Sequence, residues 1–322
     1  MPTLAEFLLA HQAELQRGTP VYLPVNPIEY HGPHLSLLND HLISVGLARD
    51  LHQRLGRGAL LIAPDLDVGF DPTPGPGTIV TSLADVKARV LAACDQLAAA
   101  GVQRVVLMTF HGSPLHALAL EAGVDRLRAK RIKVLSPLNL LLQQLLKFDG
   151  EDDDALKAAF STIQNPQTRE RAWRGLPLDF HGGFFETSVA IHYAPGSVRP
   201  GFPQVPPCPT FKATGIYAAA AAVARALGLT RRAQEMELAG AGSAWFALRP
   251  FPGYTGEPAL ANAQAGAAFA QAIIDRYAPA AEAVLYGEGR SPAPILAWLK
   301  YLPFTPGNPP VPLDAVLTSP SL

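Results

Sequence analysis

In the stretch VYLPVNPIEYHGPHLSLLNDH, residues 21–41, an apolar segment runs directly into a cluster of polar side chains. Residues 21–26 predict a buried strand. In open α/β sheets, ligands bind beyond the carboxyl ends of the strands, so a functional site is expected where this strand ends. The segment after the strand holds three of the nine histidines of the chain and two carboxylates, namely Glu29, His31, His34, Asp40 and His41.

Strand and helix patterns alternate outward from this stretch through the first half of the chain. A capping box, Ser82 followed by Asp85, marks the start of one helix. Continuous apolar strands separated by helices indicate an α/β fold with a largely parallel sheet that is covered on both faces. The further predicted strands are 59–64, 103–109 and 132–136, and the predicted helices are 41–55, 82–100 and 114–130.

The second half of the chain has a weaker pattern. Helical periodicity returns over 213–228 and 259–277. The polar segment 149–175 predicts either a surface helix pair or an inserted flap. The segment 195–212 contains six prolines and predicts an irregular crossing loop.

The ends of the chain differ in character. The first 18 residues predict an amphipathic helix that presents Leu4, Phe7 and Leu8 on one face. Residues 281–322 are rich in proline, and we expect them to form an extension that packs on the surface or on a neighbouring subunit. One domain is therefore expected over residues 1–280.

The composition of the 322 residues excludes several classes of function. The net charge is −1 and no basic cluster is present, so neither a nucleic acid nor a membrane surface is expected as a partner. Two cysteines, Cys94 and Cys208, do not form a disulfide framework. The N-terminus lacks the basic region of a signal peptide, and the alanine-rich run 218–226 is too short to span a bilayer. A cytoplasmic protein is expected.

Glu29, His31 and Asp40 form the first candidate constellation. Residues two apart in an extended segment point to the same side, so Glu29 and His31 can face one site together. A turn at Gly32 and Pro33 can return Asp40 to that site. Glutamate, histidine and aspartate are typical ligands of zinc and manganese. The alternative is that Asp40 caps a helix and that Glu29 and His31 lie in a surface loop.

Further candidates follow a later strand and open a later helix. His111 ends the apolar run VVLMTFHG at the same expected edge of the sheet, whereas His116 in the next helix is interpreted as structural. The segment DFHGGFFETS, residues 179–188, combines His181 with Glu186, and Asp179 is placed to orient the histidine. The alternatives are a structural His111 and a Glu186 that only complements a helix dipole.

The loop PTPGPGTIVTS, residues 72–82, either lines a pocket with backbone amides or is an ordinary rigid loop. It is not a phosphate loop because no lysine follows its glycines. The sequence contains no G-x-S-x-G elbow and no dinucleotide fingerprint, and neither cysteine lies near a promising histidine. Covalent serine or cysteine catalysis is therefore not expected.

Five motifs together resemble the creatininase (creatinine amidohydrolase) family. LPVNPIEYHGPHLSLLNDH is similar to its opening motif, and HGGFFETS to its H-[AG]-G-x-x-E-T-S segment. TFHGS, PGTIVTSL and GYTGEPALANAQAGAAF resemble three further family segments. The matches follow the family order from about residue 20 to about residue 277.

The resemblance implies a three-layer α/β/α fold with a mainly parallel sheet and a two-metal site that hydrolyses an amide or cyclic amide. It assigns Glu29, Asp40 and His111 to one metal, and His31, Asp40 and Glu186 to the other. His181 would protonate the departing nitrogen, and Glu186 also counts as catalytic. The implied ions are zinc, manganese or both, with iron compatible with the same ligands. The implied partners are a small-molecule amide and further copies of the chain, in a homo-oligomer such as a hexamer.

The sequence also departs from the family. Ser113 stands where creatininase itself has a metal-binding glutamate, which is why Glu186 is assigned that role. Thr109, Phe110 and Pro114 alter the expected pocket wall, which argues against creatinine as the substrate. The alternatives are a formamide deformylase, a peptide-trimming peptidase or a metal-binding scaffold without catalysis. The residues expected to contact the substrate are His34, Gly77, Thr78, Ser113, Gly182 and Gly183.

Overall fold

The computed structural model describes residues 2–147 and 154–298. Its centre is a parallel four-stranded sheet with the order β2-β1-β3-β4. In the register, Val21 of β1 lies opposite both Leu61 and Val105. All four residues of β1 are buried, as expected for a strand in the interior of a sheet covered on both faces. The strands are β1 (Val21–Pro24), β2 (Leu61–Ile62), β3 (Arg104–Met108) and β4 (Lys133–Leu135).

Twelve α-helices surround the sheet within the described residues. The first six are α1 (Leu4–Ala10), α2 (Gln12–Gln16), α3 (Asn39–Leu55), α4 (Leu83–Ala99), α5 (Pro114–Ala129) and α6 (Leu138–Lys147). The others are α7 (Asp154–Phe160), α8 (Pro166–Gly175), α9 (Phe184–Tyr193), α10 (Gly215–Ala226), α11 (Thr230–Phe246) and α12 (Ala263–Ala281). Short 3₁₀ turns lie at Leu176–Leu178, Pro195–Ser197, Phe202–Gln204 and Pro258–Leu260, and a π-helical turn at Glu282–Tyr286.

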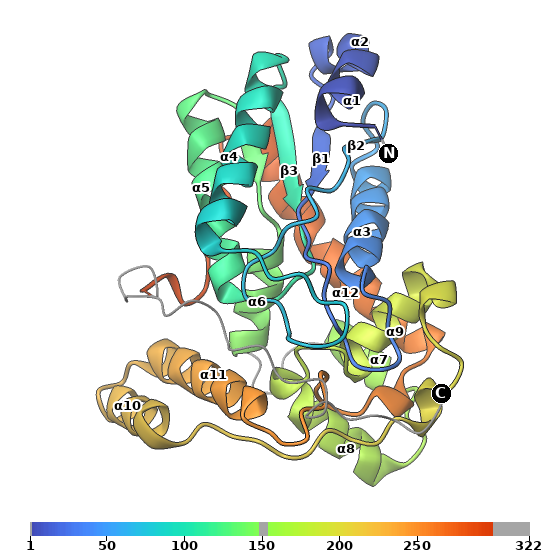
Figure 1. The fold of residues 1–322 in the computed structure, drawn as a ribbon, viewed down its shortest axis with the longest axis vertical. Coiled ribbons are helices and arrows are strands. Elements are labelled where there is room, and N and C mark those ends of the chain that lie inside the picture. Colours follow the sequence, from blue (N-terminus) through green and yellow to red (C-terminus); the bar gives the residue numbers. More distant parts are fainter. Residues whose placement is uncertain (1, 148–153, 299–322) are drawn as a thin grey trace.

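Successive strand residues point to opposite faces of the sheet and enter two separate cores. Leu23 and Leu107 pack with α1, α4 and α5 on one face. Tyr22 and Val106 pack with α3, α9 and α12 on the other face. The three-layer α/β/α fold is thus confirmed, and Figure 1 shows the helices on the two sides of the strands.

Each strand is shorter than its predicted range, and beyond the ends of β1 and β3 side chains take over part of the backbone pairing. The Val25 N–H still donates to the Met108 carbonyl at 2.8 Å. The Asn26 N–H, however, donates to Asp65 Oδ1 at 3.0 Å, and Asn26 Oδ1 accepts from the Phe110 N–H at 3.1 Å. The chain therefore leaves the sheet at the point where the candidate site begins.

The predicted N-terminal helix is interrupted. His11 has non-helical dihedral angles and separates α1 from α2, so the prediction of one continuous helix is wrong. The apolar face is nevertheless present, since Phe7, Leu8 and Leu15 are buried in the core that contains α4. The capping interaction at Ser82 is present too, because its side chain accepts from the Asp85 N–H.

The second half of the chain closes one end of the molecule. Leu156, Ala159 and Phe160 of α7 are buried against the core that contains α12. Helices α10 and α11 pack together as a hairpin beyond the carboxyl ends of the strands (Figure 1). Residues 195–212 are irregular apart from two 3₁₀ turns, as predicted.

The segment after the π-helical turn bonds to α6 through the Pro292 and Ala293 carbonyls, and Ile295 and Leu296 are buried. The division into a domain over 1–280 and an extension stays a prediction, and the part of that extension over 299–322 lies outside the described residues. No helix of the described chain combines the length and the hydropathy required to cross a membrane.

Candidate metal centre

Separate segments deliver carboxylates and imidazoles to one buried place beyond β1 and β3. Glu29 and His31 follow β1, and Asp40 lies in the first turn of α3. His111 follows β3, while His181 and Glu186 flank the start of α9. None of the six side chains belongs to a residue more than 8% exposed. Glu29 and His31 are therefore not in a surface loop.

Glu29, Asp40 and His111 form a first candidate ligand cluster. His111 Nδ1 lies 2.7 Å from Glu29 Oε2 and 3.7 Å from Asp40 Oδ2. The opposite ring nitrogen, Nε2, lies 2.9 Å from the Phe70 carbonyl, and donation there leaves Nδ1 facing the carboxylates. Burial opposes a charge on the ring, but Glu29 raises the pKa of His111 to about 9. In the folded chain, a proton or a cation is favoured between these two groups.

His31, Asp40 and Glu186 form a second cluster, which shares Asp40 with the first. His31 Nε2 lies 3.3 Å from Asp40 Oδ1 and 3.4 Å from Glu186 Oε1. The Nδ1 atom of His31 faces the Glu29 backbone carbonyl at 3.0 Å, which orients Nε2 toward the carboxylates. Burial disfavours the charged ring, yet Asp40 and Glu186 raise the pKa of His31 well above its usual range.

Backbone and amide donors fix the carboxylates in these positions. Asn39 Nδ2 donates to Glu186 Oε1 at 2.8 Å, and the Gly182 N–H donates to Glu186 Oε2 at 2.6 Å. The Thr73 N–H donates to Glu29 Oε1. Glu186 therefore does more than complement the dipole of α9, because its two oxygens face the second cluster and two fixed donors.

Asp40 does not cap α3, so that interpretation is wrong. Leu38 occupies the N-cap position, and no side chain of the described residues caps this helix end. Asp40 is the second helical residue and is 1% exposed. Its Oδ2 atom is buried without a hydrogen-bond donor among the described residues. Buried carboxylate oxygens of this kind beside histidine nitrogens fit divalent cations.

His181 lies beside both clusters. Its ring stacks on His31 with centroids 4.2 Å apart, and its Nδ1 lies 3.8 Å from Glu29 Oε1. Nε2 is 3.0 Å from the Tyr30 carbonyl, to which it donates as the protonated nitrogen. Burial, followed by the nearby His31, lowers the pKa of His181 to about 4. The ring is thus a neutral imidazole with Nδ1 available, and Glu29, His31 and His181 form a third ligand cluster.

Asp179 does not orient His181, contrary to the sequence interpretation. Asp179 Oδ2 instead accepts the Phe185 N–H at 2.9 Å at the start of α9. Burial raises the pKa of this carboxyl to about 7. The Tyr30 carbonyl orients His181 instead, by accepting a hydrogen bond from Nε2. The i, i+2 spacing of Asp179 and His181 gave no sign of this contact.

The residues expected to contact a substrate surround the centre at different depths. Ser113 lines the cavity. His34 is buried, with Nε2 2.9 Å from the Thr187 hydroxyl and 3.0 Å from the Gly182 carbonyl. Thr78 Oγ1 accepts the Tyr30 N–H and donates to the Thr73 carbonyl, so it shapes the loop that carries Glu29. Their contacts with a substrate stay predictions.

Glycine is required at three of these positions. Gly182 has a φ of +59°, and the turn it forms aims its N–H at Glu186. A Cβ on Gly183 would clash with Asp179 Oδ1 and with the Thr255 carbonyl. Gly77 has a φ of +85° and lies against Leu37 in the loop. These glycines therefore shape the site through their backbone.

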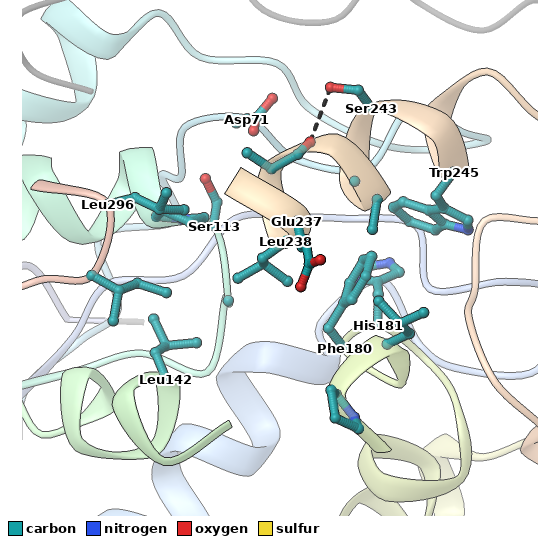
Figure 2. A pocket seen from close by; sticks show the side chains of 18 of the residues that line it. Asp71, Ser113, Leu142, Phe180, His181, Glu237, Leu238, Ser243, Trp245 and Leu296 are labelled. Atoms are coloured by element: carbon teal, nitrogen blue, oxygen red, sulfur yellow. Dashed lines mark hydrogen bonds between the residues drawn. The ribbon is translucent and has the colours of Figure 1, made fainter. Parts of the chain in front are cut away.

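A cavity of about 1570 Å³ opens from the centre, and Glu29, Asp40, His111, His181 and Glu186 all contribute to its wall. Figure 2 shows Phe180, His181 and Trp245 on one side of it and Leu142 and Leu296 on the other. Sequence reasoning missed Trp245, which lies in α11, and Asp71, which lies in the loop before the proline-glycine segment.

Asp71 is a cavity residue in an uncommon backbone conformation, with a φ of +62°. Burial raises the pKa of its carboxyl to about 6, in spite of the nearby His111 and a hydrogen bond from the Ser113 hydroxyl. The sequence signal, an acidic residue in GFDPTPGPG, is weak because only tertiary packing brings it beside His111.

These features define an α/β/α protein with a candidate metal centre at the carboxyl edge of its sheet. The family model of creatininase, described as creatinine amidohydrolase, matches residues 9–280, so the chain belongs to the creatininase family. The resemblance seen in the motifs is thus confirmed. Family membership together with the ligand clusters supports a metal-dependent amidohydrolase that acts on C–N bonds.

Two curated relatives are similar at the sequence level. The mycofactocin precursor peptide peptidase of Mycolicibacterium smegmatis is 26% identical over 183 residues, which are 55% of this chain and 59% of the peptidase. The creatinine amidohydrolase of Pseudomonas putida is 26% identical over 183 residues, which are 55% of this chain and 65% of that enzyme. The chain thus matches less than two thirds of the length of either relative.

Solved creatininase structures share the fold. A crystal structure of creatinine amidohydrolase has a TM-score of 0.54 at 21% identity, covering 85% of this chain and 93% of that one. Similar scores relate the chain to a mutant creatininase of Zn–Zn type, at 0.53, and to a manganese creatininase, at 0.52. At this identity the likeness shows the fold.

Proposed function

We propose that the protein hydrolyses an amide C–N bond with two divalent ions, one held by each ligand cluster that contains Asp40. The observation that carries the proposal is the pair of clusters joined by Asp40, whose Oδ2 atom lacks a hydrogen-bond donor among the described residues. Two bound cations would supply Lewis acidity and would lower the pKa of a water molecule between them. Zinc and manganese suit glutamate, aspartate and histidine ligands, and iron is compatible with the same set.

His181 is proposed to move the proton. Because Nε2 keeps its hydrogen and donates a hydrogen bond to the Tyr30 carbonyl, the lone pair of Nδ1 faces Glu29 and the metal centre. A neutral imidazole in this position accepts the proton that water loses on attacking the carbonyl carbon. It then gives that proton to the nitrogen as the C–N bond breaks.

Elemental analysis of metal content tests the ligand assignment. We expect about two ions per chain in the wild type, none retained in Asp40→Asn and one in Glu186→Gln. The exposed Asp275, which pairs with Arg54, offers a matched control, so Asp275→Asn should keep both ions. Retention of two ions by Asp40→Asn would overturn the shared role of this residue.

Turnover tests the proposed role of His181. His181→Ala should keep both metals and lose amide hydrolysis, which is measured as release of amine or ammonia from a panel of amides. Unchanged turnover with both ions bound would rule out His181 as the proton carrier. Loss of one ion in the same variant would instead assign His181 to the third ligand cluster.

A further inference from the structure

The cavity continues from the metal centre into a chamber walled by aliphatic side chains. Figure 2 places Leu142 and Leu296 across the cavity from His181, with Leu238 between them. The side chains of this wall carry no hydrogen-bonding groups, in contrast to the metal centre, and Glu237 of α11 lines the cavity beside Leu238. The chamber consists of Leu138, Leu141 and Leu142 of α6, Leu238 of α11, and Ile295 and Leu296 of the C-terminal segment.

The C-terminal segment that completes the chamber is an addition to the family core. The family match ends at residue 280, whereas Ile295 and Leu296 lie beyond it. The segment is fastened to α6, because Asn139 Nδ2 donates to the Pro292 carbonyl at 3.3 Å and Gln143 Nε2 donates to the Ala293 carbonyl at 2.5 Å. These bonds hold the C-terminal segment against α6.

A second fastening joins the segment to α11. Trp298 Nε1 donates to Glu235 Oε2 at 3.0 Å, and Glu235 is 2% exposed and also paired with Arg231 and Arg232. Between the two fastenings, Leu296 adopts a φ of +52°, which is strained for a residue with a side chain. Strain of this kind persists only where surrounding contacts impose it, and here it accompanies a side chain in the cavity wall.

We propose that this chamber binds a bulky apolar substituent of the amide that the metal centre cleaves. The inference rests on the proposed hydrolysis and names its substrate class. The cavity exceeds the roughly 300–1,000 Å³ of ordinary small-molecule sites, so a small polar amide would leave most of it unfilled. An aliphatic or aromatic group placed there removes apolar surface from water on both partners.

The length of the alkyl chain on the amide substrate tests the proposed chamber directly. On the metal-loaded enzyme, kcat/KM for the primary amides acetamide, butanamide, hexanamide and octanamide should rise by up to about fourfold per added methylene group. N-alkyl acetamides with the same chain lengths show whether the apolar group lies on the nitrogen side of the bond. A flat profile in both series, with acetamide hydrolysed, overturns the chamber and leaves the proposed hydrolysis standing.

Substitutions in the chamber wall test whether the dependence on chain length arises there. Leu238→Trp fills the chamber from α11, and Leu296→Ser removes apolar surface from the C-terminal segment. Each should lower the octanamide-to-acetamide ratio by about tenfold or more. Leu227, which is 69% exposed on the hairpin, provides the control Leu227→Ser, for which the ratio should stay at the wild-type value. Equal ratios in all four proteins would refute the proposal.

Binding of a fluorescent amide tests the chamber independently of amide hydrolysis. Dansyl-leucinamide should bind the metal-loaded wild type and bind Leu296→Ser about tenfold more weakly. If binding depends on Leu296 and no amide is hydrolysed, the chamber is supported and the hydrolytic function fails. Absence of binding to a folded, metal-loaded wild type overturns the chamber.

Discussion

His116 is buried beneath the candidate metal centre and shows how the fold depends on a neutral histidine. Its Nε2 lies 3.1 Å from the Val25 carbonyl, and its Nδ1 accepts the Phe70 N–H at 3.4 Å. Only the neutral ring with the proton on Nε2 makes both bonds. Burial, followed by the neighbouring His111, lowers the pKa of His116 to about 3.

This lowered pKa links stability to pH with a definite sign. An unfolded histidine has a pKa of about 6.5, so below that pH the unfolded chain binds a proton that folded His116 does not. The stabilisation is complete above pH 6.5 and is lost as the pH falls toward the folded pKa. At pH 5 the loss from this residue is about 2 kcal/mol, and at pH 7.5 it is close to zero.

His116→Gln removes the titration and keeps an amide that can donate. The variant should be less stable than the wild type at pH 7.5, and the difference should shrink by about 2 kcal/mol at pH 5. Urea denaturation of both proteins, at each pH and at one fixed metal concentration, measures this, and the comparison cancels groups common to both. A difference that stays constant or grows as the pH falls would refute a neutral, buried His116.

Three further substitutions test packing and support of the site. Gly266→Ala should destabilise by about 1–3 kcal/mol, because a Cβ there meets the Ser188 carbonyl between α9 and α12. Gly242→Ala has open space and should stabilise α11 by about 0.8–1 kcal/mol, so thermal unfolding of the two variants should shift in opposite directions. Asn39→Ala removes the donor to Glu186 and should weaken one metal site by roughly 10- to 100-fold in a chelator competition. Unchanged affinity would show that Asn39 does not support Glu186.

The sheet was predictable because its strands are short apolar runs between amphipathic helices. The approach of Glu29 and His31 to Asp40 was predictable too, since a strand end and the following turn limit where these side chains can go. His111 belongs to the same set because β3 is parallel to β1 and ends at the same edge. Each of these inferences used only local pattern and the geometry of parallel sheets.

Other parts depend on contacts between distant segments and left little trace in the sequence. Helix α11 contains the run AGAGSA, whose small residues give weak periodicity, although it carries Trp245 into the cavity wall. The interruption at His11 left no sign in the sequence, although Phe7 and Leu15 on its two sides are buried in one core. Helix α6 is different, since LNLLLQQLLK has clear helical periodicity that the sequence reasoning passed over.

The absence of a carboxylate at Ser113, and its presence at Glu186, affects both the metal centre and the access to the apolar chamber. Ser113 occupies the position where the family resemblance expects a metal-binding glutamate, and its hydroxyl accepts the His116 N–H at the start of α5. Glu186 faces the second cluster from α9 instead. Because serine is small and uncharged, the cavity wall beside His111 carries no bulky carboxylate at this position. A substrate carbonyl at the centre then has room for a large substituent, and the C-terminal segment supplies the apolar surface that such a substituent would contact.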